Sequence, residues 1–369
     1  MKKKILFLIN TLRDGGAEKI LVDIVNHLNP EKYDIEVKLI YKKGVYLDKL
    51  NDNVKLSFIT GKPGTFMATQ VSRILPRVSS ECLHKLFIKQ HYDIEVAFLE
   101  GYVTKIVAGA PKNVKKIAWV HCDLTKTEWI TGVFRNEKGF VECYKKIDEV
   151  VSVSQSVQDA FVERFGEITK LTVRYNPVLD KKIRELSKQP IELHADSSKI
   201  TLISLGRMTY PKNFMRLLKS VRNVINDNYP VELWLLGEGE EKEKLKQYIG
   251  DNHLEEQIKL IGFKKNPYPY IKQADLYVCS SIYEGFSTAA TEALILGVPV
   301  LTTEVSGMRE MLGDNEYGVI TKNTDEDFET GLRRVLCDEK VLEYYKAKAF
   351  ERGSFFEFDK RLQEIETIF

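Results

Sequence analysis

Short runs of apolar residues alternate with amphipathic stretches along the chain. Five runs in the first half are mostly apolar: residues 5–9, 35–40, 94–99, 116–120 and 150–153. Between them, residues 17–28 and 156–165 show the spacing of a helix with one apolar face. Continuous apolar strands separated by helices are typical of a parallel sheet that is buried on both faces. The first half is therefore predicted to be a Rossmann-like α/β domain.

The alternation weakens between residues 175 and 199, in a stretch that contains Asn176-Pro177 and Gln189-Pro190. Such a stretch is typical of a domain boundary. The pattern then restarts, with apolar runs at residues 200–205, 231–236, 259–261, 276–279 and 298–302. We therefore expect two doubly wound domains, 1–185 and 186–353, with parallel sheets facing across a cleft. Ligands of such sheets bind at the carboxyl ends of the strands.

Composition removes several classes of protein. The net charge is +2, so the totals give no sign of a nucleic-acid-binding protein. The five cysteines are scattered without CxxC spacing, which disfavours a disulfide framework or structural zinc and fits a reducing cytoplasm. The apolar run at residues 5–9 is shorter than the core of a signal peptide, and no stretch approaches the ~20 apolar residues of a membrane span.

The motif with the most chemistry is Glu284-Gly285-Phe286-Ser287-Thr288, with Glu292 eight positions after Glu284. It follows an apolar strand and opens a predicted helix at residues 289–296. Unpaired N–H groups at a helix start favour an anion, and two carboxylates so spaced suit ligand hydroxyls on either side of a diphosphate. The alternative interpretation is a helix start with favourable N-terminal charge.

Basic and glycine residues follow two other strands. Gly206-Arg207 and Lys212-Asn213 come after the run at residues 200–205. Arg grips phosphate with parallel hydrogen bonds and Lys adds a point charge, so the pair suits a departing nucleoside diphosphate without a metal. The alternative is a solvated basic loop.

Three residue positions in the first half are candidates for ligand contact. Gly15-Gly16 joins the first strand to the first helix, where a tight turn brings N–H groups toward a phosphate or sugar, although many such turns bind nothing. His121 and Glu100 each follow a strand. A lone histidine is more often structural, and Glu100 is a candidate for facing an acceptor.

Two further patterns imitate known motifs. Gly237-Glu238-Gly239 lacks the third glycine of a dinucleotide fingerprint, and its acidic neighbours would repel a pyrophosphate. Asp325-x-Asp327 imitates a metal-binding pair, but acidic residues in the first turn of a helix explain it. We therefore expect no metal and no cofactor.

Residues 62–91 interleave basic and apolar side chains. The basic residues include Arg73, Arg77, Lys85 and Lys89, and Glu81 is the one acidic residue. Basic amphipathic helices suit an anionic membrane surface. The alternative is that the apolar positions simply pack on the first domain.

The run from residue 258 to 312 resembles the signature region of the retaining GT-B glycosyltransferases of family 4, also called glycosyltransferase group 1. The matching residues are Gly262, Ala274-Asp275, Ser280 or Ser281, Glu284-Gly285-Phe286, Glu292 and Gly297-Val298-Pro299-Val300. The sequence departs from the family in carrying Ser287-Thr288-Ala289 where bulkier apolar residues are usual. That substitution adds hydroxyl groups near the expected phosphate.

The resemblance implies roles for individual residues. Arg207, Lys212 and the N–H groups near Phe286, Ser287 and Thr288 would bind the donor diphosphate, with Gly206 and Asn213 beside them. Glu292 would hold the ribose, Glu284 and His121 would contact the donor sugar, and Gly15 and Gly16 would face the diphosphate and the acceptor. Cys122 interrupts the family's His-Asp-like loop, which leaves the role of Asp123 open. A helix at about residues 354–369 would pack back on the first domain.

The expected activity is retaining, metal-independent transfer of a sugar from a nucleotide-sugar, with UDP-sugar the expected donor. The resemblance and the basic segment point to a saccharide acceptor, lipid-linked, for bacterial surface polysaccharide. The expected location is the cytoplasm, with peripheral attachment to the inner face of the plasma membrane through residues 62–91. Two alternatives stay open: a GT-B-fold sugar-nucleotide epimerase, and a non-catalytic nucleotide-sugar-binding partner of another transferase.

Overall fold

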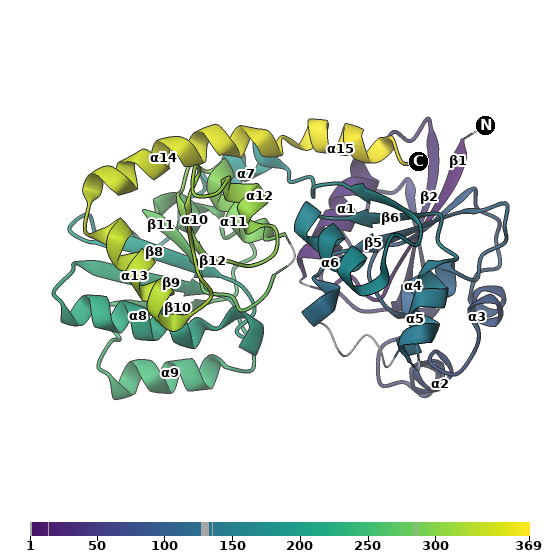
Figure 1. Ribbon diagram of the computed structural model, residues 1–369, viewed down its shortest axis with the longest axis horizontal. Coiled ribbons are helices and arrows are strands. Elements are labelled where there is room, and N and C mark those ends of the chain that lie inside the picture. Colours follow the sequence, from purple (N-terminus) through teal and green to yellow (C-terminus); the bar gives the residue numbers. More distant parts are fainter. Residues whose placement is uncertain (1, 14, 127–132, 135, 285) are drawn as a thin grey trace. The chain divides into compact units, whose positions relative to one another are not determined.

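The computed structural model describes residues 2–13, 15–126, 133–134, 136–284 and 286–369. The chain forms two compact units (Figure 1). Unit 1 comprises Met1–Pro177 together with Asp359–Phe369, and unit 2 comprises Val178–Phe358. Each unit is an α/β domain with its own parallel sheet.

Unit 1 is built on a sheet with the strand order β3-β2-β1-β4-β5-β6-β7 in the described residues. Its strands are β1 (Lys3–Ile9), β2 (Tyr33–Tyr41), β3 (Val54–Thr60), β4 (Ile94–Ala97), β5 (Lys115–Val120), β6 (Glu149–Ser152) and β7 (Lys170–Val173). All of the pairs are parallel. The order reverses between β1 and β4, which is the switch point where doubly wound sheets bind ligands.

The helices of unit 1 are α1 (Gly16–His27), α2 (Phe66–Ile74), α3 (Ser80–Phe87), α4 (Tyr102–Val107), α5 (Glu137–Tyr144) and α6 (Gln155–Phe165). The basic segment at residues 62–91 is thus two short helices. Pro76 interrupts it, because proline cannot donate the helical hydrogen bond. The hydroxyl of Ser79 then caps α3 by accepting from the N–H of Cys82.

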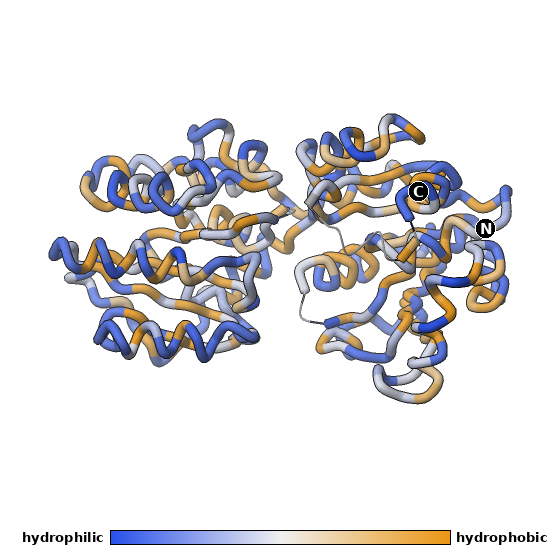
Figure 2. The backbone as a smooth tube through the Cα atoms, turned by 60° about the horizontal axis from the view of Figure 1, so that its bottom comes forward, coloured by the Kyte–Doolittle hydropathy of each residue, from blue (hydrophilic) through white to orange (hydrophobic). Residues whose placement is uncertain are grey.

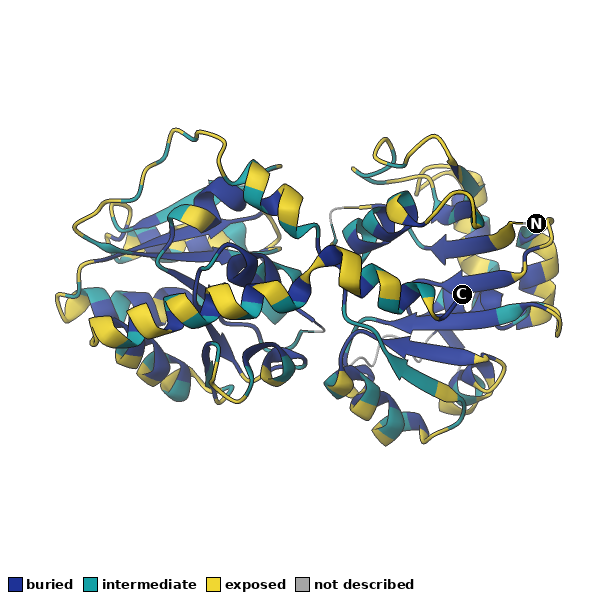
Figure 3. Ribbon diagram, turned by 90° about the horizontal axis from the view of Figure 1, so that it is seen from above, coloured by how far each residue is buried: buried dark blue, intermediate teal, exposed yellow. Residues whose placement is uncertain are grey.

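The last helix is α15 (Phe358–Glu366), and residues 359–369 belong to unit 1. The ring of Phe369 packs edge-on against Phe7 of β1 at 5.7 Å. Arg174 donates to the carbonyl of Glu364 at 2.7 Å, and Lys115 donates to the carbonyl of Ile368 at 2.6 Å. Along α15 the exposed and buried residues alternate (Figure 3).

Unit 2 is built on a sheet with the order β10-β9-β8-β11-β12-β13 in the described residues. Its strands are β8 (Ile200–Leu205), β9 (Val231–Leu236), β10 (Ile258–Gly262), β11 (Leu276–Cys279), β12 (Val300–Thr303) and β13 (Val319–Thr321). Its helices are α7 (Asp180–Leu186), α8 (Phe214–Asn226), α9 (Lys242–Asp251), α10 (Tyr268–Gln273), α11 (Thr288–Ile295), α12 (Met308–Leu312), α13 (Asp325–Leu336) and α14 (Glu339–Gly353).

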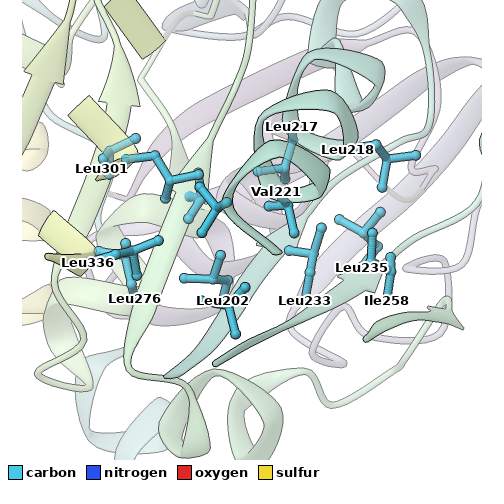
Figure 4. Close-up of a cluster of buried hydrophobic side chains, with 14 of the residues drawn as sticks. Leu202, Leu217, Leu218, Val221, Leu233, Leu235, Ile258, Leu276, Leu301 and Leu336 are labelled. Atoms are coloured by element: carbon cyan, nitrogen blue, oxygen red, sulfur yellow. The ribbon is translucent and has the colours of Figure 1, made fainter. Parts of the chain in front are cut away.

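The core of unit 2 lies between the sheet and the helices α8, α9 and α13 (Figure 4). Leu217 and Val221 of α8 meet Leu202 and Leu233 of the sheet, and all four are 0% exposed. Orange runs along the strands of both units, whereas the outer helices alternate between blue and orange (Figure 2). That contrast is the pattern from which the strands were predicted.

The boundary between the units falls at residues 177 and 178, eight positions before the predicted one. The difference has a physical cause. Helix α7 spans the predicted boundary and contacts α10 and α11, so it belongs with unit 2. Within the described residues, no helix is long and apolar enough to cross a membrane.

Candidate active site

Three loops at the carboxyl edge of the unit 2 sheet are joined by backbone hydrogen bonds. The N–H of Gly206 donates to Leu236 at 3.0 Å, that of Gly237 to Gly262 at 3.0 Å, and that of Met208 to Glu238 at 2.8 Å. A Cβ atom on Gly237 would lie 1.9 Å from the carbonyl oxygen of Gly206. Glycine after β9 therefore allows the two loops to approach closely. This explains the glycine-rich sequence without dinucleotide binding.

Lys212 and Glu284 form an ion pair at this edge. The two residues lie 72 positions apart, yet Lys212 Nζ is 2.5 Å from Glu284 Oε1, with side-chain exposures of 27% and 12%. Ser281 Oγ donates to the same oxygen at 2.6 Å. Burial lowers the pKa of Lys212, but the attraction of Glu284 outweighs it, so the net pKa lies above the usual value. Lys212 is therefore a cation at neutral pH.

The neighbours of Lys212 hold it in place. Gly206, at φ 154°, leaves room for the lysine stem: a Cβ there would be 3.2 Å from Lys212 Cε. Asn213 is left-handed at φ 45° and caps α8. Arg207 is exposed, and no hydrogen bond of its side chain is found in the described residues. Its charge lies close enough to oppose protonation of Lys212, so the two cations share one region.

Helix α11 begins beside this region. Ser287 is its N-cap and accepts from the N–H of Ala290 at 3.4 Å, while Thr288 is its first residue. The ring of Phe286 packs against Phe356 at 5.9 Å. Glu292 is 6% exposed and accepts from the hydroxyl of Tyr268 at 3.3 Å. Gly285 lies outside the described residues.

Tyr277 of β11 lies within electrostatic range of both predicted carboxylates. Burial raises the pKa of this phenol well above its usual value, and the charges of Glu284 and Glu292 raise it further, while Ser287 forms a hydrogen bond with it. Both glutamates therefore lie near one buried side chain. The structure brings Glu284, Ser287, Glu292, Lys212 and Arg207 to one edge of unit 2.

In unit 1, Gly15 and Gly16 form the start of α1. Gly15 is the N-cap with no side chain to accept a hydrogen bond. The carboxylate of Glu18 folds back instead, so that a Cβ on Gly15 would be 2.1 Å from Glu18 Oε2. Asp14 lies outside the described residues. A ligand contact of Gly15 and Gly16 stays a prediction.

His121 and Glu100 lie together at the carboxyl edge of the unit 1 sheet. Glu100 is 5% exposed, and its Oε1 accepts from the backbone N–H groups of His121 and Cys122. Glu100 thus holds the loop that carries His121, and its contact with an acceptor stays a prediction. Asp123 accepts from the hydroxyl of Thr125 at 2.6 Å and stabilises the next turn. Within the part of the chain that the structure describes, His121 Nε2 is buried without a hydrogen-bond partner, which is costly unless a ligand supplies one.

The imidazole of His121 is expected to stay neutral throughout the working pH range. Burial lowers its pKa to about 3 from 6.5, although a hydrogen bond with the backbone of Phe98 opposes this. The unfolded chain binds the proton near pH 6.5 and the folded chain does not. The contribution of His121 to the stability of the folded chain is therefore full above pH 6.5 and is lost as the pH falls toward 3. An NMR titration from pH 8 to pH 5 should leave the His121 ring signal, assigned with His121→Asn, unmoved; a midpoint near pH 6.5 would contradict the burial argument.

Asp325 and Asp327 begin α13, as predicted. Thr324 caps the helix and accepts from the N–H of Asp327. Asp325 accepts from the guanidinium of Arg216 at 2.6 Å, and Arg216 is 8% exposed. Asp325 is thus held in an ion pair, and Asp327 is held by the residue that caps the helix.

The sequence analysis missed the residues that support the site. Asn323, Thr303 and Tyr268 each hydrogen-bond a predicted site residue or its loop, and Arg216 hydrogen-bonds Asn323. Their partners are 22 to 107 positions away along the chain. No local spacing could have signalled these pairs.

Two α/β domains, each built on its own parallel sheet, are the architecture of the GT-B fold. Residues 187–352 match the family described as glycosyl transferases group 1, and the matched residues all lie in unit 2. The second half of the chain is therefore similar to the glycosyl transferases of group 1.

Two enzymes and one solved structure are similar to this chain over 89% or more of its length. A Campylobacter jejuni enzyme is 25% identical over 372 residues, covering 96% of each chain; its name is N-acetylgalactosamine-N,N'-diacetylbacillosaminyl-diphospho-undecaprenol 4-alpha-N-acetylgalactosaminyltransferase. An Escherichia coli enzyme, UDP-Gal:alpha-D-GlcNAc-diphosphoundecaprenol alpha-1,3-galactosyltransferase, is 24% identical over 89% of this chain and 86% of its own. Anabaena HepE, solved in complex with UDP, has a TM-score of 0.78 at 20% identity and covers 100% of this chain and 99% of its own.

Proposed function

We propose that this glycosyltransferase moves a sugar from a UDP-sugar to a lipid-linked saccharide, without a metal ion and with retention of anomeric configuration. The observation that carries the proposal is the arrangement at the edge of unit 2. Arg207 and Lys212 lie together there, and Glu284 holds Lys212.

The charges of this group suit a departing nucleoside diphosphate. Negative charge grows on the diphosphate as the glycosidic bond breaks, and fixed cations stabilise it most where water is excluded. Lys212 keeps its proton. Arg207 is exposed and available for the two parallel bonds that a guanidinium forms with phosphate. N–H groups at the start of α11 add the partial positive charge of a helix N-terminus.

Metal independence is supported by the environment of Asp325 and Asp327. The first pairs with Arg216 and the second receives a bond from the cap residue Thr324, so both are occupied in the folded chain. With Arg207 and Lys212 neutralising the diphosphate, no divalent cation is required for that purpose.

The donor and acceptor are proposed from the relatives. The names of the Campylobacter and E. coli enzymes specify an undecaprenol diphosphate acceptor, and the E. coli name specifies UDP-Gal. Anabaena HepE was solved with UDP and with UDP-glucose. Retention is supported by the alpha products in both relatives' names, since UDP-galactose itself carries an alpha linkage.

A transfer assay tests the proposal. Purified protein with UDP-hexose or UDP-N-acetylhexosamine donors and a short polyprenyl-diphosphate saccharide should give an alpha-linked product, seen by mass spectrometry and by the anomeric coupling in NMR. The same rate is expected in excess EDTA. Transfer that stops in EDTA and returns with manganese or magnesium would overturn metal independence. Turnover of the donor to an epimer with no acceptor present would favour an epimerase instead.

The surface of α2 and α3 supports a membrane-associated acceptor. Phe66 and Met67 at the start of α2 are 81% and 61% exposed, and Leu86 of α3 is 49% exposed. Four exposed basic residues lie on the same segment: Arg73, Arg77, Lys85 and Lys89. Glu81, its one acidic residue, is paired with Lys146 at 2.6 Å. Val71 and Leu75 are buried, so the segment is part core and part exposed apolar surface, and we propose that it docks on anionic lipid.

Vesicle binding should follow the charge of this segment. The protein is expected to bind vesicles of phosphatidylglycerol and to ignore those of phosphatidylcholine, with release on added salt because the attraction is screened beyond about 8 Å. Replacing the four basic residues by glutamine should remove several kcal/mol, at about 1 kcal/mol each. The control replaces four exposed lysines of unit 2, Lys219, Lys244, Lys246 and Lys340. Equal binding to both vesicle types, or equal loss in the control, would refute this docking surface.

A further inference from the structure

The loop that carries Glu284 is fixed from three directions. The N–H of Ile282 donates to the carbonyl of Pro211 at 2.7 Å, and Ser280 Oγ donates to the carbonyl of Lys212 at 3.0 Å. From β12, Thr303 Oγ1 donates to the carbonyl of Ser281 at 2.6 Å. The loop after β11 is therefore bound to the loop after β8 and to the end of β12.

The third direction is Asn323, which follows β13. Its side-chain N–H₂ donates to the carbonyl of Ile282 at 2.9 Å. Its Oδ1 accepts from Arg216 Nη1 at 2.6 Å. Since a primary amide has one donor end and one acceptor end, Arg216 fixes the orientation that presents the donor end to Ile282.

Arg216 is held in turn by Asp325. The guanidinium is 8% exposed and donates through Nε to Asp325 Oδ1 at 2.6 Å, so two of its nitrogens have separate partners. An arginine buried to this degree needs such partners, because its charge is costly in a low dielectric. The chain of contacts runs from Asp325 through Arg216 and Asn323 to Ile282, two residues before Glu284.

We propose that Arg216 and Asn323 are positioning residues for Glu284, acting through the backbone of residues 281–282. The inference rests on the proposed function, because it assigns a support to the same site. Ser281 ends the relay: its Oγ donates to Glu284 Oε1, the oxygen that also meets Lys212. With Oε1 so occupied, the relay determines which carboxylate oxygen is left for the donor sugar. Asp325, one of the two acidic residues that imitate a metal motif, thus supports the active site through Arg216 and Asn323.

The effect should fall on turnover rather than on donor binding. Asn323→Ala frees the carbonyl of Ile282 and lets Glu284 shift. A displacement of about 1 Å in a reacting group typically costs on the order of 100-fold. We therefore expect a 10–100-fold loss of kcat on that principle, with the donor KM close to that of wild type. Asn323→Asp should behave alike, since it still accepts from Arg216 but cannot donate to Ile282.

Asn223→Ala is the matched control. Asn223 lies on α8 and donates to Glu329 of α13 at 2.7 Å, so it joins the same two helices without touching the loop. If Asn323 only stabilised the fold, Asn223→Ala would lower kcat as much as Asn323→Ala does.

A double-mutant cycle with Glu284→Ala separates the proposals. If Asn323 acts through Glu284, then Asn323→Ala should cost nothing further in the Glu284→Ala background. An equal fold-loss of kcat in both backgrounds, or wild-type kcat in Asn323→Asp, would overturn the relay while leaving the proposed function intact. Wild-type turnover in Glu284→Ala alone would instead remove Glu284 from the site, and the relay with it.

Discussion

Lys212→Ala and Arg207→Ala should each lower the rate of sugar transfer by about 100–1,000-fold, the typical cost of removing one preorganised group that stabilises developing charge. The reason is their common position at the carboxyl edge of the unit 2 sheet, where Lys212 is protonated and Arg207 lies nearby. Steady-state kinetics of the purified variants give the measurement.

Lys346→Ala is the matched control for folding. Lys346 is also a partly exposed lysine of unit 2 with a carboxylate partner, Asp275 at 3.3 Å, but it lies on α14. We expect wild-type rates from it. Near-normal rates in Lys212→Ala and Arg207→Ala, with the three proteins equally folded by circular dichroism, would remove these residues from the active site.

Glu292→Ala should weaken donor binding by about 10–150-fold, which corresponds to the 1.5–3 kcal/mol of a hydrogen bond to a charged group. The carboxylate is buried near Tyr277, and we propose that it binds the ribose hydroxyls. Isothermal titration with UDP and with 2′-deoxy-UDP measures the effect. The losses from the variant and from the missing hydroxyl should not add.

Tyr268→Phe tests the hydrogen bond that holds Glu292, apart from the charge of Glu292 itself. It removes the 3.3 Å hydrogen bond to Glu292 and keeps the charge, so a smaller loss of affinity is expected. Additive losses for Glu292→Ala and the deoxy nucleotide would show that this residue does not contact the ribose 2′-hydroxyl.

Sequence periodicity alone predicts the ten strands named in the sequence analysis, because each is a mostly apolar run in a parallel sheet. The remaining strands β3, β7 and β13 were not among them. Most residues of β3 and β7, the two edge strands of the unit 1 sheet, are half-buried, and β13 has only three residues. Half-buried and short strands carry little of the apolar signal that marks buried ones.

The candidate site was predictable only where its residues sit in a motif. Glu284, Ser287 and Glu292 span nine residues after one strand, and Lys212 lies five positions after Arg207. The contact between Lys212 and Glu284 crosses 72 positions, and that between Arg216 and Asn323 crosses 107. Such pairs depend on the order of strands in the sheet, and a single sequence does not reveal that order.

The chain order of the two units bears on how the protein folds during synthesis. Residues 359–369 pack on β1 through Phe369 and Phe7, but the ribosome makes them after the whole of unit 2. Unit 2 is continuous in sequence from Val178 to Phe358, so it can close as soon as it has emerged. Unit 1, although its strands emerge first, must leave the apolar surface around Phe7 open until the last helix arrives. That interval is when the nascent chain is most exposed to aggregation, and a chaperone that covers the unit 1 sheet would have its greatest effect then.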